Sequence, residues 1–175
     1  MKKFNTYIQE KLQKINSKNS TQYKYFPKDK KELEQIIKDL IKERGNEANL
    51  NDIDTSEITD MSELFAYFKF NGDISRWDVS NVTNTVDMFI GSKFNGNISN
   101  WNVSKVKNMG NMFANSDFNS DISNWDVSNV ENMALMFYGS KFKGDLSKWD
   151  VSNVKNMRGM FYKSGLANNP PKWYK

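Results

Sequence analysis

A pattern that returns at a fixed interval constrains this chain more than any other feature of its sequence. Its clearest marker is a tryptophan with an isoleucine or leucine three residues before it and a valine two residues after it. The four tryptophans of this pattern are Trp77, Trp101, Trp125 and Trp149. One such unit is too short to bury its own apolar face, so neighbouring units are expected to stack and share a core.

The repeat divides the chain into three predicted regions. Residues 47–166 are predicted to form five 24-residue solenoid repeats. Residues 1–46, which have a different composition, are predicted to form an N-terminal helical cap on the first repeat. Residues 167–175 are predicted to be a C-terminal stop, because Pro170 and Pro171 stand where the next strand would begin.

The apolar spacing changes within each unit. Apolar and polar residues alternate around the tryptophan, as in a half-buried β-strand. Further along, the spacing is that of a short helix, and Ser128 with Glu131 has the form of a helix-capping pair. The helical stripe of one copy is Val130, Met133, Met136 and Phe137. Strand–crossover–strand connections are right-handed in nearly all proteins. The predicted fold is therefore α/β: a right-handed leucine-rich-repeat-like solenoid with a short-stranded parallel β-sheet and an N-terminal helical cap.

The cap region contains two predicted helices. An apolar stripe between Phe4 and Ile15 predicts the first. For the second, Asp29 followed by Glu32 is a start signal and Gly45 a stop signal. Residues 1–46 hold 12 Lys or Arg and 6 Asp or Glu. That excess leaves open a second reading, in which basic N-terminal helices bind an anionic membrane or nucleic acid.

Several strings of the repeat resemble a known family. They are the recurring WDVSNV, the N-M-x-x-M-F that follows it (Asn132 to Phe137) and the FNGDIS joint (Phe70 to Ser75). These motifs resemble the repeats of BspA-like leucine-rich-repeat proteins, also described as a bacterial lipoprotein-associated repeat of unknown function. The resemblance implies a surface protein with a role in attachment.

The composition gives little support to an enzyme. The chain has no histidine and no cysteine. It therefore lacks the commonest general base, a thiol nucleophile and any disulfide. No glycine-rich phosphate-binding string or nucleophile-elbow string occurs. We therefore expect a non-catalytic chain with no cofactor, no metal and no small-molecule substrate.

A column of carboxylates and amides follows the tryptophans. It could in principle hold a hard cation such as calcium. The favoured interpretation is structural, because Asp and Asn side chains at turns accept hydrogen bonds from their own backbone. This structural turn column is Asp54, Asp78, Asn102, Asp126 and Asp150.

The positions that vary between copies are the candidate partner-binding residues. One outward position beside the tryptophan changes from coil to coil, and another position, on the predicted helix side, becomes aromatic towards the end of the chain. Aromatic residues are common interface anchors. The candidates are Arg76, Asn100, Asn124 and Lys148 beside the tryptophans, and Tyr138 and Tyr162 on the other side.

The sequence thus predicts a monomeric protein-binding or scaffold module whose partner is a protein. The alternative is a peripheral membrane or nucleic-acid binder that acts through the N-terminus. The first residues lack an apolar signal core and a lipobox cysteine, and no segment is long and apolar enough to span a membrane. As written, the chain is expected in the cytoplasm, and at the surface if a leader was removed.

Overall fold

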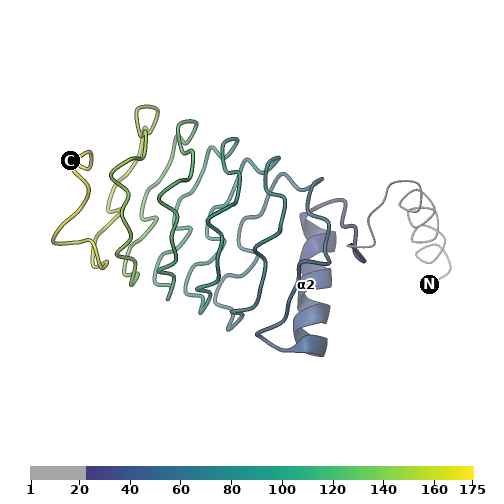
Figure 1. Cartoon of the computed structure of the whole chain (residues 1–175). Helices are drawn as coiled ribbons and strands as arrows, with labels where there is room; N and C mark the ends of the chain where they lie inside the picture. Colours follow the sequence, from purple (N-terminus) through teal and green to yellow (C-terminus); the bar gives the residue numbers. More distant parts are fainter. Residues whose placement is uncertain (1–22) are drawn as a thin grey trace.

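A computed structural model describes residues 23–175 of the chain. One helix, α2 (Lys30–Arg44), stands at one end of a row of irregular coils that lie side by side (Figure 1). Within residues 23–175 no other helix and no β-strand forms, and the strand-like pairing consists of isolated parallel bridges. The predicted first helix, between Phe4 and Ile15, lies outside the described residues.

Backbone hydrogen bonds join each coil to the next. The amides of Thr85, Asp87, Phe89 and Gly91 donate to carbonyls of the following coil, with N–O distances of 2.8–3.0 Å. Equivalent sets of four begin at Met61, Met109 and Met133. Alternate amides therefore point along the stack. This ladder holds successive coils in one register.

The same ladder shows why the predicted short helices are wrong. An α-helix would use these amides internally, four residues back. Here the segment is a run of tight turns in which Met88 N donates to Thr85 O at 3.2 Å. Asp87 and Gly91 have φ of 57° and 62°, which no α-helix contains. Without a helix there is also no capping pair, and the amide of Ser128 donates to Asp126 instead.

The predicted α/β leucine-rich-repeat-like solenoid with a parallel sheet is likewise contradicted. The segment around Trp77 bends instead of extending, since Trp77 N donates to Ile74 O at 3.2 Å and Val82 N to Val79 O at 2.9 Å. Hydrogen bonds between an amide and the carbonyl three residues earlier are those of β-turns. The recurring bridges lie away from the tryptophans, in the row Asp60, Asn84, Asn108, Asn132 and Asn156. The tryptophans nevertheless face the core, because each of the four from Trp77 to Trp149 is no more than 5% exposed.

Aromatic side chains form the centre of the stack. One column of phenylalanines stacks along the coils with ring-centroid distances of 5.5–5.8 Å. It consists of Phe65, Phe89, Phe113, Phe137 and Phe161. A second column runs beside it at 6.1–6.3 Å. It consists of Phe70, Phe94, Phe118 and Phe142. All nine rings are almost completely buried. Burial of this apolar surface is the main stabilising contribution, because no single coil encloses a core.

The tryptophans add a polar link between coils. Trp77 Nε1 donates to Leu50 O at 3.0 Å, and Trp125 Nε1 donates to Ile98 O at 3.1 Å. Trp101 and Trp149 make the equivalent bonds. A buried indole N–H needs such an acceptor. The repeated isoleucine or leucine thus supplies a backbone carbonyl as well as apolar surface.

The second predicted helix of the cap is confirmed as α2. Asp29 caps it by accepting a hydrogen bond from Glu32 N at 2.9 Å, and Gly45 follows its end with φ of 85°. Leu33, Ile37 and Leu40 form its buried face and join the common core. An apolar helix face therefore covers the first coil at the N-terminal side of the stack.

Candidate interaction surface

The structural turn column lies in Asx turns. In each coil the side-chain oxygen accepts a hydrogen bond from the backbone amide of the serine two residues later, at 2.9–3.2 Å. The members are Asp54, Asp78, Asn102, Asp126 and Asp150. The serine hydroxyl and amide lower the pKa of Asp126, and the serine amide and side chain lower the pKa of Asp150. These oxygens already accept hydrogen bonds within their own turns.

Sequence reasoning missed two further polar columns. Asp73, Asn97, Asp121 and Asp145 form a second Asx column just before the tryptophans. A third column links coils directly. The backbone amides of Asn95, Asn119 and Lys143 each donate to the Oδ1 of an asparagine in the preceding coil, at 2.7–2.8 Å. Its acceptors are Asn71, Asn95 and Asn119. Their recurrence at the repeat length was the available signal.

The outward position beside the tryptophans forms an exposed row, here called the variable row. Its members are Arg76, Asn100, Asn124 and Lys148, from four successive coils. Each side chain is exposed. Within residues 23–175 none of the four side chains forms a hydrogen bond or an ion pair. The variable row is therefore chemically diverse and available to a partner.

The two tyrosines lie together. Tyr138 and Tyr162 stack with ring centroids 5.8 Å apart, and Lys163 Nζ lies 5.4 Å from the Tyr162 ring. Tyr162 is 60% exposed, whereas Tyr138 is partly buried. A stacked, exposed aromatic pair beside a cation suits contact with an apolar or aromatic group.

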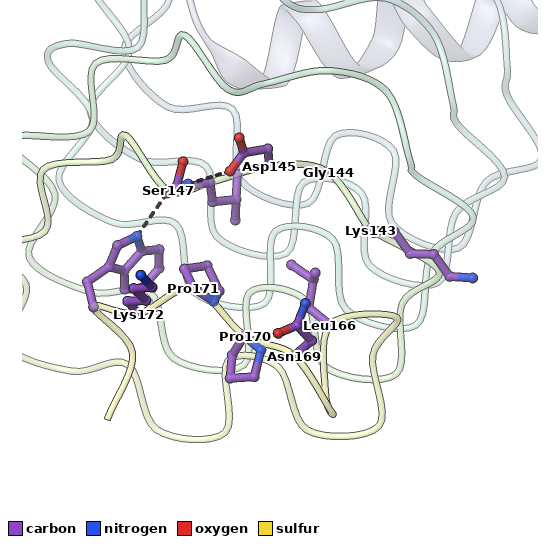
Figure 2. Close-up of a pocket in the computed structure, with 11 residues that line it drawn as sticks. Lys143, Gly144, Asp145, Ser147, Leu166, Asn169, Pro170, Pro171 and Lys172 are labelled. Atoms are coloured by element: carbon purple, nitrogen blue, oxygen red, sulfur yellow. Dashed lines mark hydrogen bonds between the residues drawn. The ribbon is translucent and has the colours of Figure 1, made fainter.

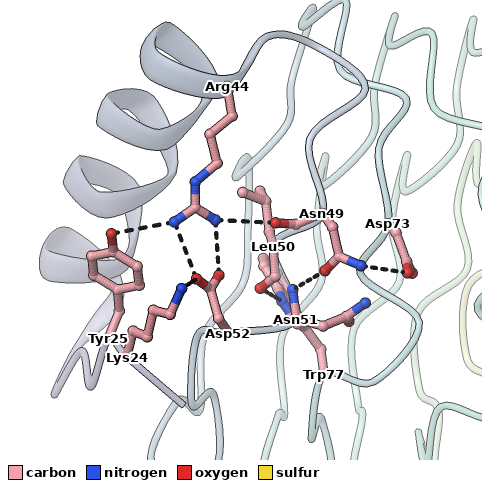
Figure 3. A network of polar contacts seen from close by, with 9 residues as sticks. All are labelled: Lys24, Tyr25, Arg44, Asn49, Leu50, Asn51, Asp52, Asp73 and Trp77. Atoms are coloured by element: carbon pink, nitrogen blue, oxygen red, sulfur yellow. Dashed lines mark hydrogen bonds and ion pairs between the residues drawn. The ribbon is translucent and has the colours of Figure 1, made fainter. Parts of the chain in front are cut away.

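The first coil differs from the others at the variable-row position, where Asp52 stands. Figure 3 shows Asp52 held from both sides by residues of the cap. Arg44 binds its carboxylate with both terminal nitrogens, at 3.0 and 3.1 Å, and Lys24 lies 3.8 Å from it. The backbone of Tyr25 also pairs in parallel with Ile53. Asp52 is therefore used to attach the cap, and only the four later members of the row face outward freely.

A cleft of about 480 Å³ opens near the C-terminal end of the stack. Figure 2 shows it between Asp145 and Ser147 on one side and Pro170 and Pro171 on the other. Two of its polar groups are paired within the chain, since Asp145 accepts from Ser147 N at 2.8 Å and Leu146 O accepts from Trp173 Nε1 at 2.8 Å.

The asparagine column ends at Lys143, which is one of the residues that line the cleft. The backbone amides of Asn95, Asn119 and Lys143 each donate to an asparagine side chain in the coil before. Because position 143 is lysine, Ala167 has no such acceptor and donates to Ser164 O instead. Trp173 still packs on Trp149, with centroids 6.5 Å apart. The predicted stop thus contains one side chain that repeats the coil pattern.

Charge is unevenly distributed along the stack. Residues 23–140 contain 12 Lys or Arg and 18 Asp or Glu, whereas residues 141–175 contain 8 and 2. Two basic side chains are paired across coils, Lys141 with Asp117 at 2.7 Å and Lys155 with Glu131 at 2.6 Å. Lys141 and Lys93 lower the pKa of Asp117, and Lys155 lowers that of Glu131. The last coil is therefore the basic end of the stack.

Neither a metal cluster nor a membrane-spanning helix is seen in residues 23–175. No group of three or more acidic, histidine or cysteine side chains in this part of the chain is arranged to hold a metal ion. Among the same residues, no helix has the length and apolar character needed to cross a membrane.

Comparison with known proteins gives a family but no characterised relative. No curated protein and no solved structure matches the chain. One family matches, described as "Mycoplasma protein of unknown function, DUF285", over residues 31–139 and again over residues 114–174. The two matches overlap and together cover α2 and the stacked coils. The chain therefore belongs to the DUF285 family of proteins of unknown function.

Proposed function

We propose that this protein is a non-catalytic binding module that presents the variable row to a protein partner. The observation that carries the proposal is the contrast between the recurring polar residues and the variable ones. The recurring Asp and Asn side chains form hydrogen bonds within turns or between coils. The variable row repeats the same outward position without forming such bonds.

The physical argument concerns rigidity and availability. A ladder of backbone bonds and two stacked phenylalanine columns hold successive coils in one register. Side chains at the same position of each coil are therefore held in a fixed row. The backbone that carries this row is pre-organised and loses little conformational freedom on binding. Arg76 and Lys148 at its ends can provide charged contacts, and the two asparagines between them can provide hydrogen bonds.

The two tyrosines define the competing surface for the same function. The variable row is preferred because four coils contribute to it, whereas the tyrosine pair involves two.

The test compares two double variants in one binding experiment. The bait is the full chain, and partners that crosslink to it are quantified by mass spectrometry. Arg76→Ser with Lys148→Ser is expected to reduce partner recovery at least tenfold, while thermal unfolding stays near that of the parent chain. Lys31→Ser with Lys69→Ser removes the same charge from exposed side chains elsewhere and is the matched control.

Three outcomes would contradict this assignment. Recovery that survives loss of Arg76 and Lys148 but fails with Tyr138→Ala and Tyr162→Ala would move the site to the tyrosine pair. Equal loss with the control variant would indicate non-specific electrostatics. Recovery of nucleic acid or anionic vesicles in place of protein would favour the alternative that places binding at the basic N-terminus.

A further inference from the structure

The last coil contains a row of backbone amides without acceptors. In the coil before it, Met133, Leu135, Phe137 and Gly139 donate to four carbonyls at 2.8–3.0 Å. The equivalent amides, one repeat later, belong to Met157, Gly159, Phe161 and Lys163. None of these four donates to an acceptor within residues 23–175. We call this row the open edge.

The open edge keeps the conformation that pairs elsewhere in the stack. Met160 N donates to Met157 O at 3.2 Å, and Tyr162 N donates to Gly159 O at 3.1 Å, as in the earlier coils. Gly159 and Lys163 have positive φ of 64° and 57°, matching the two such residues of each earlier coil. The amides are therefore already oriented for acceptors at the spacing of a polypeptide backbone.

The opposite end of the stack is covered by α2. There the buried face of α2 packs into the core, and Lys30 Nζ donates to Ser62 Oγ at 2.7 Å. Residues 24 and 25 also donate to Asp52 O. One end thus has a covering helix, while the other offers free donors. An unpaired amide row is a template for pairing with another chain.

The charge around the open edge indicates what kind of chain would bind. Arg158 and Lys163 lie in the edge segment and form no ion pair within the described residues. Residues 141–175 have four times as many basic as acidic side chains. Tyr162, between these cations in the sequence, is 60% exposed. Acidic side chains on a bound segment would be attracted to this surface.

We propose that the open edge binds an acidic segment of a second polypeptide by adding one more layer to the stack. Its carbonyl oxygens accept hydrogen bonds from Met157, Gly159, Phe161 and Lys163, while its carboxylates face Arg158 and Lys163. The four coil–coil ladders within the chain are the structural precedent for this contact. The inference rests on the proposed protein-binding function and adds the chemistry of the partner and a second contact surface.

The chain itself provides a matched pair of probes. Residues 55–68 belong to the first coil and contain three acidic and no basic side chains. Residues 151–164 lie in the same register and contain three basic and no acidic side chains. Both are used as synthetic peptides with blocked ends. Their binding to the full chain is measured by fluorescence polarisation at low and high salt.

The acidic peptide is expected to bind at least tenfold more tightly than the basic one, and high salt should weaken it. With saturating acidic peptide, hydrogen exchange at the amides of Met157, Gly159 and Lys163 is expected to slow at least tenfold. Arg158→Glu with Lys163→Glu should weaken binding at least tenfold. Lys31→Glu with Lys69→Glu, the same charge change elsewhere, should not.

Specific outcomes would overturn the proposal. If the acidic peptide binds without slowing hydrogen exchange at the open-edge amides, its binding is only an attraction to surface charge. Equal binding of the basic peptide would remove the charge argument. Slower exchange caused more strongly by a single-stranded oligonucleotide would assign the edge to nucleic acid. Arg76→Ser with Lys148→Ser leaves the open edge intact. Loss of peptide binding in that variant would therefore contradict the edge assignment. Retained peptide binding would show that the open edge and the variable row are tested independently.

Discussion

Arg44, the last residue of α2, binds both carboxylate oxygens of Asp52 in the first coil, at 3.0 and 3.1 Å. The same guanidinium donates to Asn49 O and Tyr25 Oη. The hydrogen bonds to Asp52 raise the pKa of Arg44 above its ordinary value. One side chain therefore connects the helix, the segment before it and the first coil.

Arg44→Gln is expected to destabilise the chain by about 1 kcal/mol, because a partly exposed ion pair of good geometry is lost. Urea unfolding measures the change. Lys42→Gln removes a charge from the same helix without breaking a hydrogen bond or ion pair of the described residues. Combining Arg44→Gln with Asp52→Asn should cost less than the sum of the single changes. Strictly additive effects would show that the pair contributes nothing as a pair.

Trp125 tests the aromatic core and the indole bond separately. The side chain is 4% exposed and donates to Ile98 O. Trp125→Ala is expected to cost about 3–5 kcal/mol through the cavity that it leaves. Trp125→Phe keeps a ring and removes the indole hydrogen bond, while Ile98 O still accepts from Trp101 N at 3.1 Å. The loss of that one hydrogen bond is expected to cost about 1 kcal/mol. Chemical denaturation gives both values, and a negligible cost for Trp125→Phe would contradict a role for the hydrogen bond.

The Asx columns predict acid sensitivity. Native hydrogen bonds from the serines lower the pKa of Asp126 and Asp150, so the folded state favours their charged form. Their stabilisation is complete above the unfolded pKa of about 3.9 and is lost as pH falls towards the lower folded pKa. The urea concentration at the unfolding midpoint should therefore decrease as the pH is lowered below about 4.

Asparagine substitution tests this cause of the acid sensitivity. Asn102 accepts the same serine amide bond without titrating. Asp126→Asn with Asp150→Asn should therefore shift the acid decline to lower pH or reduce it. Glu47→Gln, outside the Asx columns, should leave the decline unchanged. An identical pH profile for the double variant and the parent chain would refute the assignment.

Leu135 occupies a strained backbone position. Its φ is 57°, where the equivalent residues of neighbouring coils are Asn111 and Gly159. A left-handed conformation costs an ordinary side chain about 1 kcal/mol, and asparagine tolerates it better. Leu135→Asn is therefore expected to raise the melting temperature. Leu135→Ala keeps the strain and removes the side chain, so it should not stabilise. A less stable asparagine variant would show that the packing of the leucine beside Gly159 outweighs the strain.

The sequence by itself determined the register of this protein. Because the stacked coils share one core, the large core side chains recur at the repeat length, and the spacing of the tryptophans from Trp77 to Trp149 set the boundaries of the coils. The cap helix was equally visible, since Asp29 and Gly45 act locally on their own turns.

Only the tertiary structure decided the path of the chain within each coil. An apolar stripe at Val130, Met133 and Phe137 is compatible with a helix or with successive turns, because both can place these side chains on one face. The choice depends on where the amides find acceptors, and here the acceptors are carbonyls of the neighbouring coil. The Arg44–Asp52 pair and the open edge likewise arise from contacts between coils, which spacing along a single chain does not specify.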